Sequence, residues 1–392
     1  MGYTMARARA VVIGGGIGGL AAAAGLSAAG WEVTAFERAT SLEPVGAGLG
    51  LAPNGLRALD TVGAGDELRA HAVPQEMGMR RPDGRWLVRS TTGKMVADRF
   101  GDSIILVPRA AVVDALVARV PDGVIALGTE VTAVTPGGKA TARVVTTAGD
   151  LDADLIVAAD GIGSTTRAFL FPDHPGLRYA GFTTWRLITG PVREPVQMAE
   201  TWGRGTIVGV MPLSDGRVYC YAAAPAAPGA RAGDELAELV RRFGGWHEPI
   251  PGLLASARPD SVLRHDVAEL AAPLPSFAAG RVALLGDAAH PMAPNLGQGA
   301  CQALEDAAVL ARFATGISPD AVPGMLARYS AVRLPRTSDV VRWSRRASVM
   351  ATWTSPAAVA LRDTVVRVAG KLAPNTALRG LDGVYGWQPP AA

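Results

Sequence analysis

The chain contains few cysteines, and they lie far apart. Cys220 and Cys301 are the only two among 392 residues. A disulfide framework or a zinc site needs more cysteines at closer spacing, so the sequence predicts neither, and we find no other cluster of metal-ligating residues. Reduced thiols are typical of the cytoplasm, which is therefore the expected location.

Charge is also scarce and nearly balanced. Charged residues make up 19% of the chain, and 38 Lys and Arg stand against 35 Asp and Glu. No basic run with interleaved aromatic residues occurs, so a nucleic-acid partner is not expected. With 49% apolar residues the composition is that of a globular protein, and the length suits two domains.

The chain has one long uncharged apolar run near its start, Ala10–Trp31, which is long enough to cross a bilayer. Five glycines between positions 14 and 19 would badly weaken such a helix. The run also has no convincing signal-peptide cleavage site. The sequence therefore predicts no integral membrane span.

The same run is better interpreted as strand, turn and helix. Ala10–Ile13 is apolar throughout, as expected of a parallel strand buried on both faces. A Gly-x-Gly-x-x-Gly turn follows, then a small-residue helix over Leu20–Ala29 and a second strand over Val33–Phe36. This order is the fingerprint of a dinucleotide-binding unit.

The glycines and the acid after the second strand have distinct chemical roles. A side chain at Gly14 or Gly16 would obstruct a pyrophosphate approaching the helix N-terminus, and Gly19 completes the turn. Glu37 can accept hydrogen bonds from a ribose. Arg38 either contacts the adenosine half or is a solvated surface residue. This motif alone does not distinguish NAD from FAD.

Two later motifs place an acidic residue directly after a buried strand. Asp160 follows the strand Leu155–Ala159, with Ser164 as the expected N-cap of the next helix. Asp287 follows the strand Arg281–Leu285, and a proline-rich loop then leads to a helix over Ala300–Phe313. Either motif alone could be an ordinary strand, turn and capped helix.

The chain resembles the class A, single-component flavoprotein aromatic hydroxylases in three motifs taken together. They are the glycine turn, Asp160-Gly161 with Arg167, and Gly286-Asp287 with "HPMAPNLGQGA". The family is that of para-hydroxybenzoate and salicylate hydroxylase, and the resemblance spans nearly the whole chain. It implies FAD as the cofactor. It also implies NADPH or NADH as the reductant, between which the sequence does not choose, and O2 as co-substrate.

The resemblance assigns the cofactor contacts residue by residue. The pyrophosphate would bind at the glycine turn, the ribose at Glu37, and adenine at the backbone of Val131. Asp160 would lie near the pyrophosphate, with Arg167 supporting its loop, while Val45–Gly48 would border the isoalloxazine ring. The complete set is Gly14, Gly16, Gly19, Glu37, Arg38, Gly48, Arg109, Val131, Asp160, Asp287, Gly299 and Ala300.

The fold implied is an α/β, Rossmann-like FAD-binding domain of the glutathione-reductase type, with an inserted α+β substrate domain of mixed β-sheet. We expect the FAD-binding domain to comprise residues 1–73, 100–176 and 276–345. The substrate domain would comprise 74–99 and 177–275, followed by a C-terminal helical region over 346–392. The oligomeric state, monomer or homodimer, is left open.

The activity implied is insertion of one oxygen atom from O2 into a small aromatic or heteroaromatic molecule through a flavin C4a-hydroperoxide. An isoprenoid epoxidase or reductase, and a flavoprotein that only sequesters a ligand, remain alternatives. Because the cofactor carries the chemistry, no catalytic triad is needed. His290 is a candidate base or an ordinary loop histidine. Cys301 lies at the start of a predicted helix, and we expect its side chain to pack against the flavin rather than to act as a reactive thiol.

The inserted domain supplies the substrate candidates. Residues two apart in a strand share one face, so two of its tyrosines point the same way and Cys220 points opposite. The sequence does not reveal which face meets the flavin. Few cations occur there, which favours a neutral substrate. The candidates are Trp185, Arg186, Met211, Tyr219 and Tyr221.

Ser344–Val368 is amphipathic, with Arg345, Arg346, Arg362 and Arg367 among Val, Ala and Leu. This segment either packs on its own domain or docks on a membrane surface.

Overall fold

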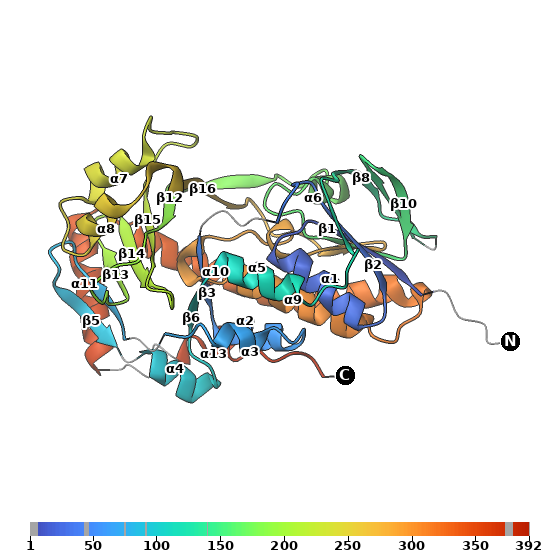
Figure 1. Ribbon diagram of the computed structural model, residues 1–392, viewed down its shortest axis with the longest axis horizontal. Helices are drawn as coiled ribbons and strands as arrows, with labels where there is room; N and C mark the ends of the chain where they lie inside the picture. Colours follow the sequence, from blue (N-terminus) through green and yellow to red (C-terminus); the bar gives the residue numbers. More distant parts are fainter. Residues whose placement is uncertain are drawn as a thin grey trace.

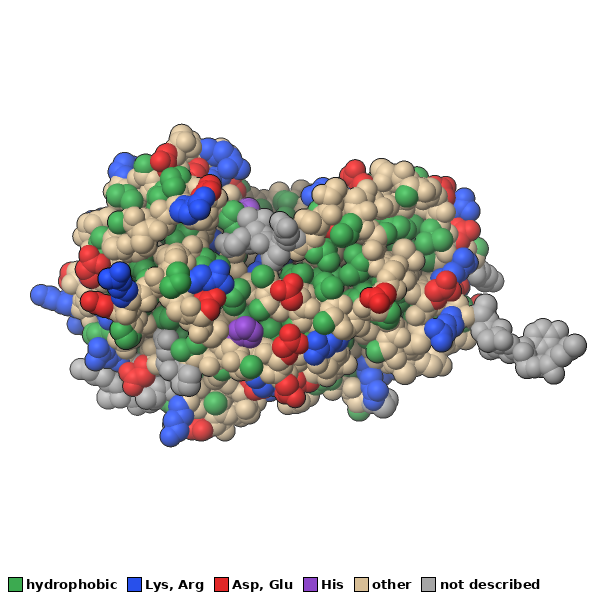
Figure 2. Space-filling view, viewed as in Figure 1, with side chains coloured by type: hydrophobic (Ala, Val, Ile, Leu, Met, Phe, Trp, Pro, Cys, Tyr) green, Lys and Arg blue, Asp and Glu red, His purple; other side chains and the backbone are tan. Residues whose placement is uncertain are grey.

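The computed structural model describes residues 7–42, 47–73, 76–90, 92–138, 140–372 and 379–391. It consists of two lobes joined by long strands and helices (Figure 1). The right-hand lobe in that view contains β1, β2 and α1, and the left-hand lobe contains β12 to β15. In the space-filling view, a hollow separates the lobes at the upper edge (Figure 2).

A six-stranded sheet forms the core of the first lobe, in the order β17-β18-β11-β1-β2-β7. All neighbours are parallel except the β17–β18 pair. The strands are β1 (Arg9–Ile13), β2 (Glu32–Glu37), β7 (Ile125–Leu127), β11 (Leu155–Ala158), β17 (Ala278–Ala279) and β18 (Val282–Leu284). This mostly parallel sheet agrees with the Rossmann-like domain that the sequence predicts.

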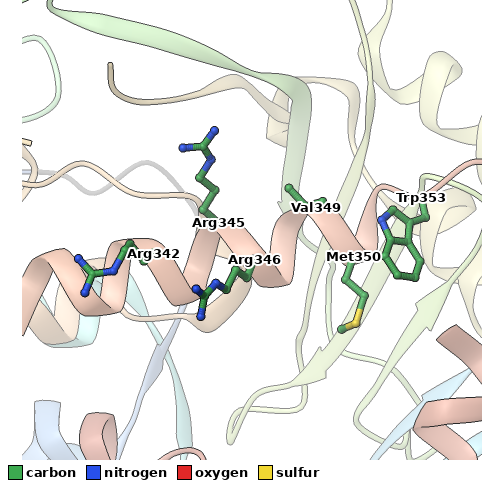
Figure 3. A pocket seen from close by; sticks show the side chains of 6 residues that line it. All are labelled: Arg342, Arg345, Arg346, Val349, Met350 and Trp353. Carbon is green, nitrogen blue, oxygen red and sulfur yellow. The ribbon is translucent and has the colours of Figure 1, made fainter. Parts of the chain in front are cut away.

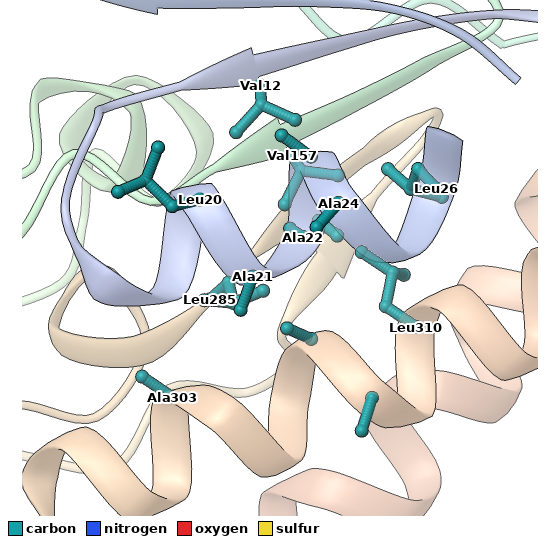
Figure 4. Close-up of a cluster of buried hydrophobic side chains, with 14 of the residues drawn as sticks. Val12, Leu20, Ala21, Ala22, Ala24, Leu26, Val157, Leu285, Ala303 and Leu310 are labelled. Atoms are coloured by element: carbon teal, nitrogen blue, oxygen red, sulfur yellow. The ribbon is translucent and has the colours of Figure 1, made fainter. Parts of the chain in front are cut away.

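Helix α1 (Ile17–Ala28) packs between this sheet and α9 (Gly299–Ala314), as Figure 4 shows. The helix begins three residues earlier than predicted, because Gly18 and Gly19 are helical. A Cβ on Gly18 would lie 2.5 Å from Leu285, and one on Gly25 would lie 2.7 Å from Ala311. Small residues are therefore required by the close helix packing.

Smaller elements surround this core. The chain also forms a three-stranded antiparallel sheet, a two-stranded pair and short helices. They are β8 (Val131–Thr135), β9 (Ala142–Thr146) and β10 (Gly149–Ala153); β3 (Gly48–Leu51) and β6 (Ile105–Pro108); and α2 (Pro53–Asp60), α3 (Gly65–Arg69), α4 (Thr92–Phe100), α5 (Arg109–Val117) and α6 (Thr165–Leu170).

The second lobe is built on a seven-stranded sheet in the order β16-β12-β15-β14-β13-β4-β5. Its helices, α7 (Glu235–Phe243) and α8 (Ile250–Ser256), contribute to one hydrophobic cluster with one face of the sheet. The strands are β4 (Met77–Arg80), β5 (Trp86–Ser90), β12 (Leu177–Ile188), β13 (Ala199–Trp202), β14 (Ile207–Pro212), β15 (Val218–Pro225) and β16 (Leu263–Leu270).

The chain ends in helices. α10 (Val322–Ala351) contacts α9, and α11 (Pro356–Leu372) contacts β5; α13 (Asp382–Tyr385) follows. Across the described ranges, none of the helices combines the length and apolar character that crossing a bilayer would require.

Candidate functional site

Four neighbouring parallel strands bring the three sequence motifs to one edge of the sheet. β18, β11, β1 and β2 lie side by side in that order. Asp287 follows β18, Asp160 follows β11, the glycine turn follows β1, and Glu37 ends β2. Parallel strands end at a common edge, where α/β folds bind their ligands. The motifs therefore form one site.

The three glycines of the turn serve two different purposes. Gly14 has φ +106°, and a Cβ there would lie 2.4 Å from the Ala159 carbonyl oxygen. A Cβ on Gly19 would lie 1.9 Å from the Gly14 oxygen. A Cβ on Gly16, by contrast, would meet no atom within 4 Å. The fold itself requires Gly14 and Gly19, whereas Gly16 borders open space at the N-terminus of α1.

Glu37 is held in place by backbone amides. Its two carboxylate oxygens accept hydrogen bonds from the Gly15 amide at 2.6 Å and the Ala39 amide at 2.8 Å. Arg38 is exposed directly after β2, and Val131 begins β8 close to the same edge, where Thr129 donates its amide to the Glu37 carbonyl at 3.0 Å. Val45 and Gly46, predicted at the flavin, lie outside the described residues.

Arg167 links the Asp160 turn to the Asp287 loop. Its guanidinium donates to the carbonyls of Ile162 at 2.7 Å and of Ala288 at 3.0 Å. Ser164 caps α6 as predicted, by accepting a bond from the Arg167 amide at 2.9 Å. One oxygen of Asp160 accepts from the Thr166 amide at 3.1 Å, while the other is buried and finds no partner among the described residues.

Asp287 lies where the two lobes approach each other, since Arg109 of one lobe and Arg186 of the other are close enough to act on its charge, and the space between the lobes is called the crevice below. Asp287 is itself exposed, whereas its neighbours in the chain, Gly286 and Ala288, are buried. The surrounding protein desolvates the carboxyl group and raises its pKa, and the charges of His290, Arg109, Arg186 and Arg167 act in the opposite direction. Such an acid can accept hydrogen bonds from hydroxyl groups of a ligand that enters the crevice.

Cations from both lobes meet near Asp287. Arg109 begins α5 in the first lobe, and Arg186 lies on β12 in the second. Burial lowers the pKa of Arg109; Asp287 opposes this shift and Arg186 adds to it. The crevice between the lobes is therefore positively charged on both sides.

The N-terminus of α9, at the end of the loop that begins at Asp287, is not capped by a side chain. Gln298 occupies the N-cap position. Gly299 and Ala300 are partly buried, and a Cβ on Gly299 would meet no atom within 4 Å. Uncapped amides and the helix dipole favour a negatively charged group at this position.

Behind this helix end lies a buried polar network that the sequence analysis missed. Asp306 accepts hydrogen bonds from the Gly286 amide at 2.9 Å, from His290 Nε2 at 2.6 Å and from Arg333 Nε at 2.6 Å. Burial alone would raise the pKa of Asp306, but the charges of His290 and Arg333 outweigh it, and the pKa is lowered. The network thus holds the strand end that precedes Asp287.

A second branch of the network holds the start of α9. Glu305 pairs with Arg333 and with Arg336 at 2.6 Å, and accepts from Asn54 Nδ2 at 2.7 Å. Asn54 also donates to Gln298 Oε1 at 2.9 Å. The visible signal was an acidic pair, Glu305-Asp306, inside an otherwise apolar helix.

His290 belongs to this network and does not reach the crevice as a free base. Its side chain is only 3% exposed, its Nε2 is bonded to Asp306, and its ring lies 5.6 Å from that of Phe277. Its Nδ1 is buried and has no partner among the described atoms. Of the two roles that the sequence left open for His290, these contacts favour the histidine bonded within the fold over the substrate base.

The face of the second sheet that meets the first lobe is the tyrosine face. A Cβ on Gly48 would lie 2.4 Å from the Tyr219 ring, and Tyr219 and Met211 form a cluster with Leu106 of β6. Arg186 is paired with Tyr221 in register and shares this face. These contacts show which face of the sheet meets the first lobe.

Trp185 and Cys220 lie on the opposite face. The Trp185 indole donates to Glu235 Oε2 at 2.7 Å and packs in the core under α7. Because neighbouring residues of a strand alternate, Trp185 points away from the crevice that Arg186 faces. The structure does not bring Trp185 together with the other substrate candidates.

Glu200 is a further polar residue on the tyrosine face that the sequence analysis missed. It accepts a short hydrogen bond from the Tyr221 hydroxyl and one of 2.8 Å from the Trp202 indole. The Tyr221 ring crosses Gly209 to reach it, since a Cβ on Gly209 would lie 2.2 Å from that ring. Burial and the Glu200 carboxylate raise the pKa of Tyr221 well above its usual value.

Both thiols are expected to be unreactive in the folded protein. Burial raises the pKa of Cys220 and of Cys301 to about 12, so almost no thiolate exists at neutral pH. We expect no alkylation by iodoacetamide at pH ~8, where a free cysteine reacts readily, and two alkylated sites after unfolding, measured by mass spectrometry. Rapid labelling of Cys301 in the native protein would contradict its buried position.

Comparison with known proteins agrees with this geometry. The family model "FAD binding domain" matches residues 7–344. The chain is 36% identical to an aurachin C monooxygenase/isomerase of Stigmatella aurantiaca, over 91% of this chain and 93% of the relative. It is 35% identical to a 3-amino-4-hydroxybenzoate 2-monooxygenase of Streptomyces cremeus, over 86% of both.

Among solved structures, that of Klebsiella pneumoniae HpxO with FAD and uric acid matches with a TM-score of 0.87 and 28% identity. The match covers 98% of this chain and 97% of HpxO. The chain belongs to the FAD binding domain family and is an FAD-dependent monooxygenase of the aromatic hydroxylase type.

Proposed function

We propose that the protein uses NADPH or NADH and O2 to insert one oxygen atom into a planar aromatic or heteroaromatic molecule held between its two lobes. The observation that carries this proposal is the convergence of Gly16, Asp160 and Asp287 at one sheet edge, beside the uncapped start of α9. The tyrosine face of the second sheet closes the same crevice.

The residues present fit FAD. The open space at Gly16 and the amides of α1 suit the pyrophosphate, and Glu37 suits the adenosine ribose. The unpaired oxygen of Asp160 and the exposed carboxyl group of Asp287 suit polar groups of the cofactor chain. These roles are proposals that rest on the open and unpaired groups of the site.

When bound, FAD supplies the redox chemistry that passes one atom of O2 to the substrate. The protein's own contribution is positioning, charge and exclusion of water. The start of α9, with Gly299 and Ala300, would stabilise negative charge on the ring. Arg109 and Arg186 would add positive potential, and the tyrosine face would exclude water from the reacting atoms.

The pairing of Tyr221 with Glu200 supports a substrate that carries an O–H or N–H group. Tyr221 donates its only proton to Glu200, so the hydroxyl can offer only its lone pairs to a ligand. The names of the relatives are compatible with aromatic or heteroaromatic substrates, among them 3-amino-4-hydroxybenzoate and, in the HpxO complex, uric acid.

Tyr221→Phe is expected to lower substrate-stimulated NAD(P)H oxidation by about 10- to 100-fold, because the hydrogen bond that orients the substrate is lost. FAD content should be unchanged. Trp185→Phe is the matched control, since it changes an aromatic residue on the other face of the same sheet. Equal losses in both variants would contradict the assignment of the tyrosine face to the substrate.

The test of the function is a turnover assay on the purified yellow protein. Oxidation of NADH and of NADPH is followed over a panel of phenols, quinolones, purines and polyenes. Stimulated oxidation with a product heavier by one oxygen atom supports the proposal. An oxygenated polyene would indicate an epoxidase, and tight binding without turnover would indicate a sequestering protein.

A further inference from the structure

The outer face of α10 carries a groove that is separate from the flavin site. Two rows of side chains, each spaced four residues apart, line a cavity of about 410 Å³ (Figure 3). One row consists of Arg342, Arg346 and Met350, and the other of Arg345, Val349 and Trp353, of which Trp353 lies just after the end of α10. Arginines thus occupy one end of the groove, and apolar side chains the other.

The inner face of the same helix segment is already occupied. Ser344 donates to the Ala293 carbonyl and Ser348 to the side chain of Asn295, at the loop between Asp287 and α9. Both serines are buried, whereas the three groove arginines and Val349 are exposed. Packing on the protein, one of the two possibilities considered from the sequence, therefore holds for one face of the segment, and the opposite face is exposed.

Large apolar side chains are unusually exposed along this part of the chain. Of the eleven exposed large hydrophobic residues in the described ranges, five lie between positions 343 and 368. Two of them lie on α10 and three on α11, and Val349 is the one that lines the groove. The five are Trp343 (45% exposed), Val349 (54%), Leu361 (60%), Val365 (55%) and Val368 (49%).

The charge of the groove indicates what would cover it. Arg342 contacts Asp339, Arg345 lies 3.7 Å from Glu269, and Arg346 has no acidic partner among the described residues. Glu269 is buried and also pairs with Arg178. The groove therefore keeps an excess of positive charge and favours an anionic partner.

A second copy of the chain would fit this face less well than a lipid surface would. In a two-fold symmetric dimer the same patch meets itself, so the arginines would face arginines. A lipid surface matches both ends of the groove, because headgroup phosphates pair with guanidinium groups while tryptophan and valine enter the interfacial region.

We propose that the outer face of α10 docks the protein on an anionic lipid bilayer. Arg342, Arg345 and Arg346 contact the headgroup phosphates, and Val349 and Trp353 insert at the boundary with the acyl chains. Arginine side chains near an anionic surface each add to the affinity, and the attraction falls with ionic strength. This proposal does not depend on the substrate or on turnover.

The test is vesicle flotation of the FAD-loaded protein. Vesicles of phosphatidylcholine alone are compared with vesicles that also contain phosphatidylglycerol, at low and high salt. We expect the protein to float only with the anionic vesicles and to be released by salt. Arg342→Glu with Arg346→Glu should weaken binding by at least about tenfold, and Val349→Glu should also weaken it.

Matched controls lie in the second lobe. Arg241 and Arg258 are exposed and, like Arg342, each contacts an acidic residue nearby in sequence. Val240 on α7 is 46% exposed. Arg241→Glu with Arg258→Glu, and Val240→Glu, should bind vesicles as the unchanged protein does. The flavin spectrum of every variant reports whether the site and fold are intact.

Several outcomes would overturn the proposal. Failure of the unchanged protein to float with anionic vesicles would do so. Equal loss of vesicle binding in the control variants would also do so, because it would indicate that the whole charged protein is attracted to the vesicles without a defined docking surface. A dimer in solution that the groove substitutions dissociate would identify a second copy as the occupant instead.

Discussion

Gly16→Val is expected to abolish FAD binding while the apoprotein remains folded. A Cβ at this position would meet no protein atom within 4 Å, and the backbone angles of Gly16, φ −75° and ψ 177°, are accessible to valine. The new methyl groups would fill the space at the N-terminus of α1 that the pyrophosphate needs. Two hydrogen bonds from amides to a charged group contribute about 3 kcal/mol or more, so we expect affinity to fall more than about 100-fold.

The neighbouring glycines provide the contrast for this experiment. Gly14→Ala and Gly19→Ala would push a Cβ to within 2.4 Å and 1.9 Å of backbone oxygen atoms. These two variants should lose stability with or without cofactor, whereas Gly16→Val should keep the melting temperature of the apoprotein nearly unchanged. FAD titration followed by flavin fluorescence, together with thermal unfolding, separates the two classes. Normal FAD affinity in Gly16→Val would show that the pyrophosphate does not bind at this turn.

Arg333→Met is expected to be the most destabilising substitution of a single charged residue in the first lobe. Arg333 has no exposed surface and bonds to Glu305, to Asp306 at 2.6 Å and to Gln302. Its removal leaves two buried carboxylates without their main partner, and loss of one partner of a buried ion pair costs about 3–5 kcal/mol. FAD affinity should also fall, because Gly286 and Gln298 are held through this network.

Two companion variants define the cause of that loss. Arg336 also pairs with Glu305, but its side chain is 17% exposed and Arg333 remains paired with the same carboxylate when Arg336 is replaced, so Arg336→Met should cost less. Adding Asp306→Asn to Arg333→Met removes one uncompensated charge and should recover part of the stability, as a double-mutant cycle in urea would measure. A fully additive cycle would mean that the two residues do not interact.

Much of the cofactor site follows from local sequence. The glycine turn, the strands on either side of it, and the acids after β11 and β18 each follow from short-range rules of strand, turn and helix formation. Parallel strands end at a common edge, so Asp160, Asp287 and Glu37 could be expected together before any contact was known. The start of α1 was misjudged because Gly18 and Gly19 were assigned to the turn, whereas close packing makes them helical.

The orientation of side chains depended on partners distant in the chain. Along β12 and β15 the side chains alternate, so Trp185 and Arg186 lie on opposite faces of the sheet, as do Cys220 and Tyr221. Only the packing determines which face α7 covers and which face meets β3 of the first lobe. His290 turns inward because Asp306 lies there with Arg333 behind it. Local patterns carry no information about such pairings.

Arg362 illustrates the same limit most clearly. In the sequence it is one of several arginines on an amphipathic segment, yet it is fully buried, bonded to Asp363 at 2.9 Å, with its guanidinium 5.2 Å from the Trp202 ring. The sequence alone therefore predicted the strand ends and the turn, since these depend on neighbouring residues, and the resemblance of three distant motifs to a flavoprotein family indicated the cofactor class. Folding in three dimensions determined which charges are buried and which face lines the crevice, because burial depends on elements that meet only after the chain has folded.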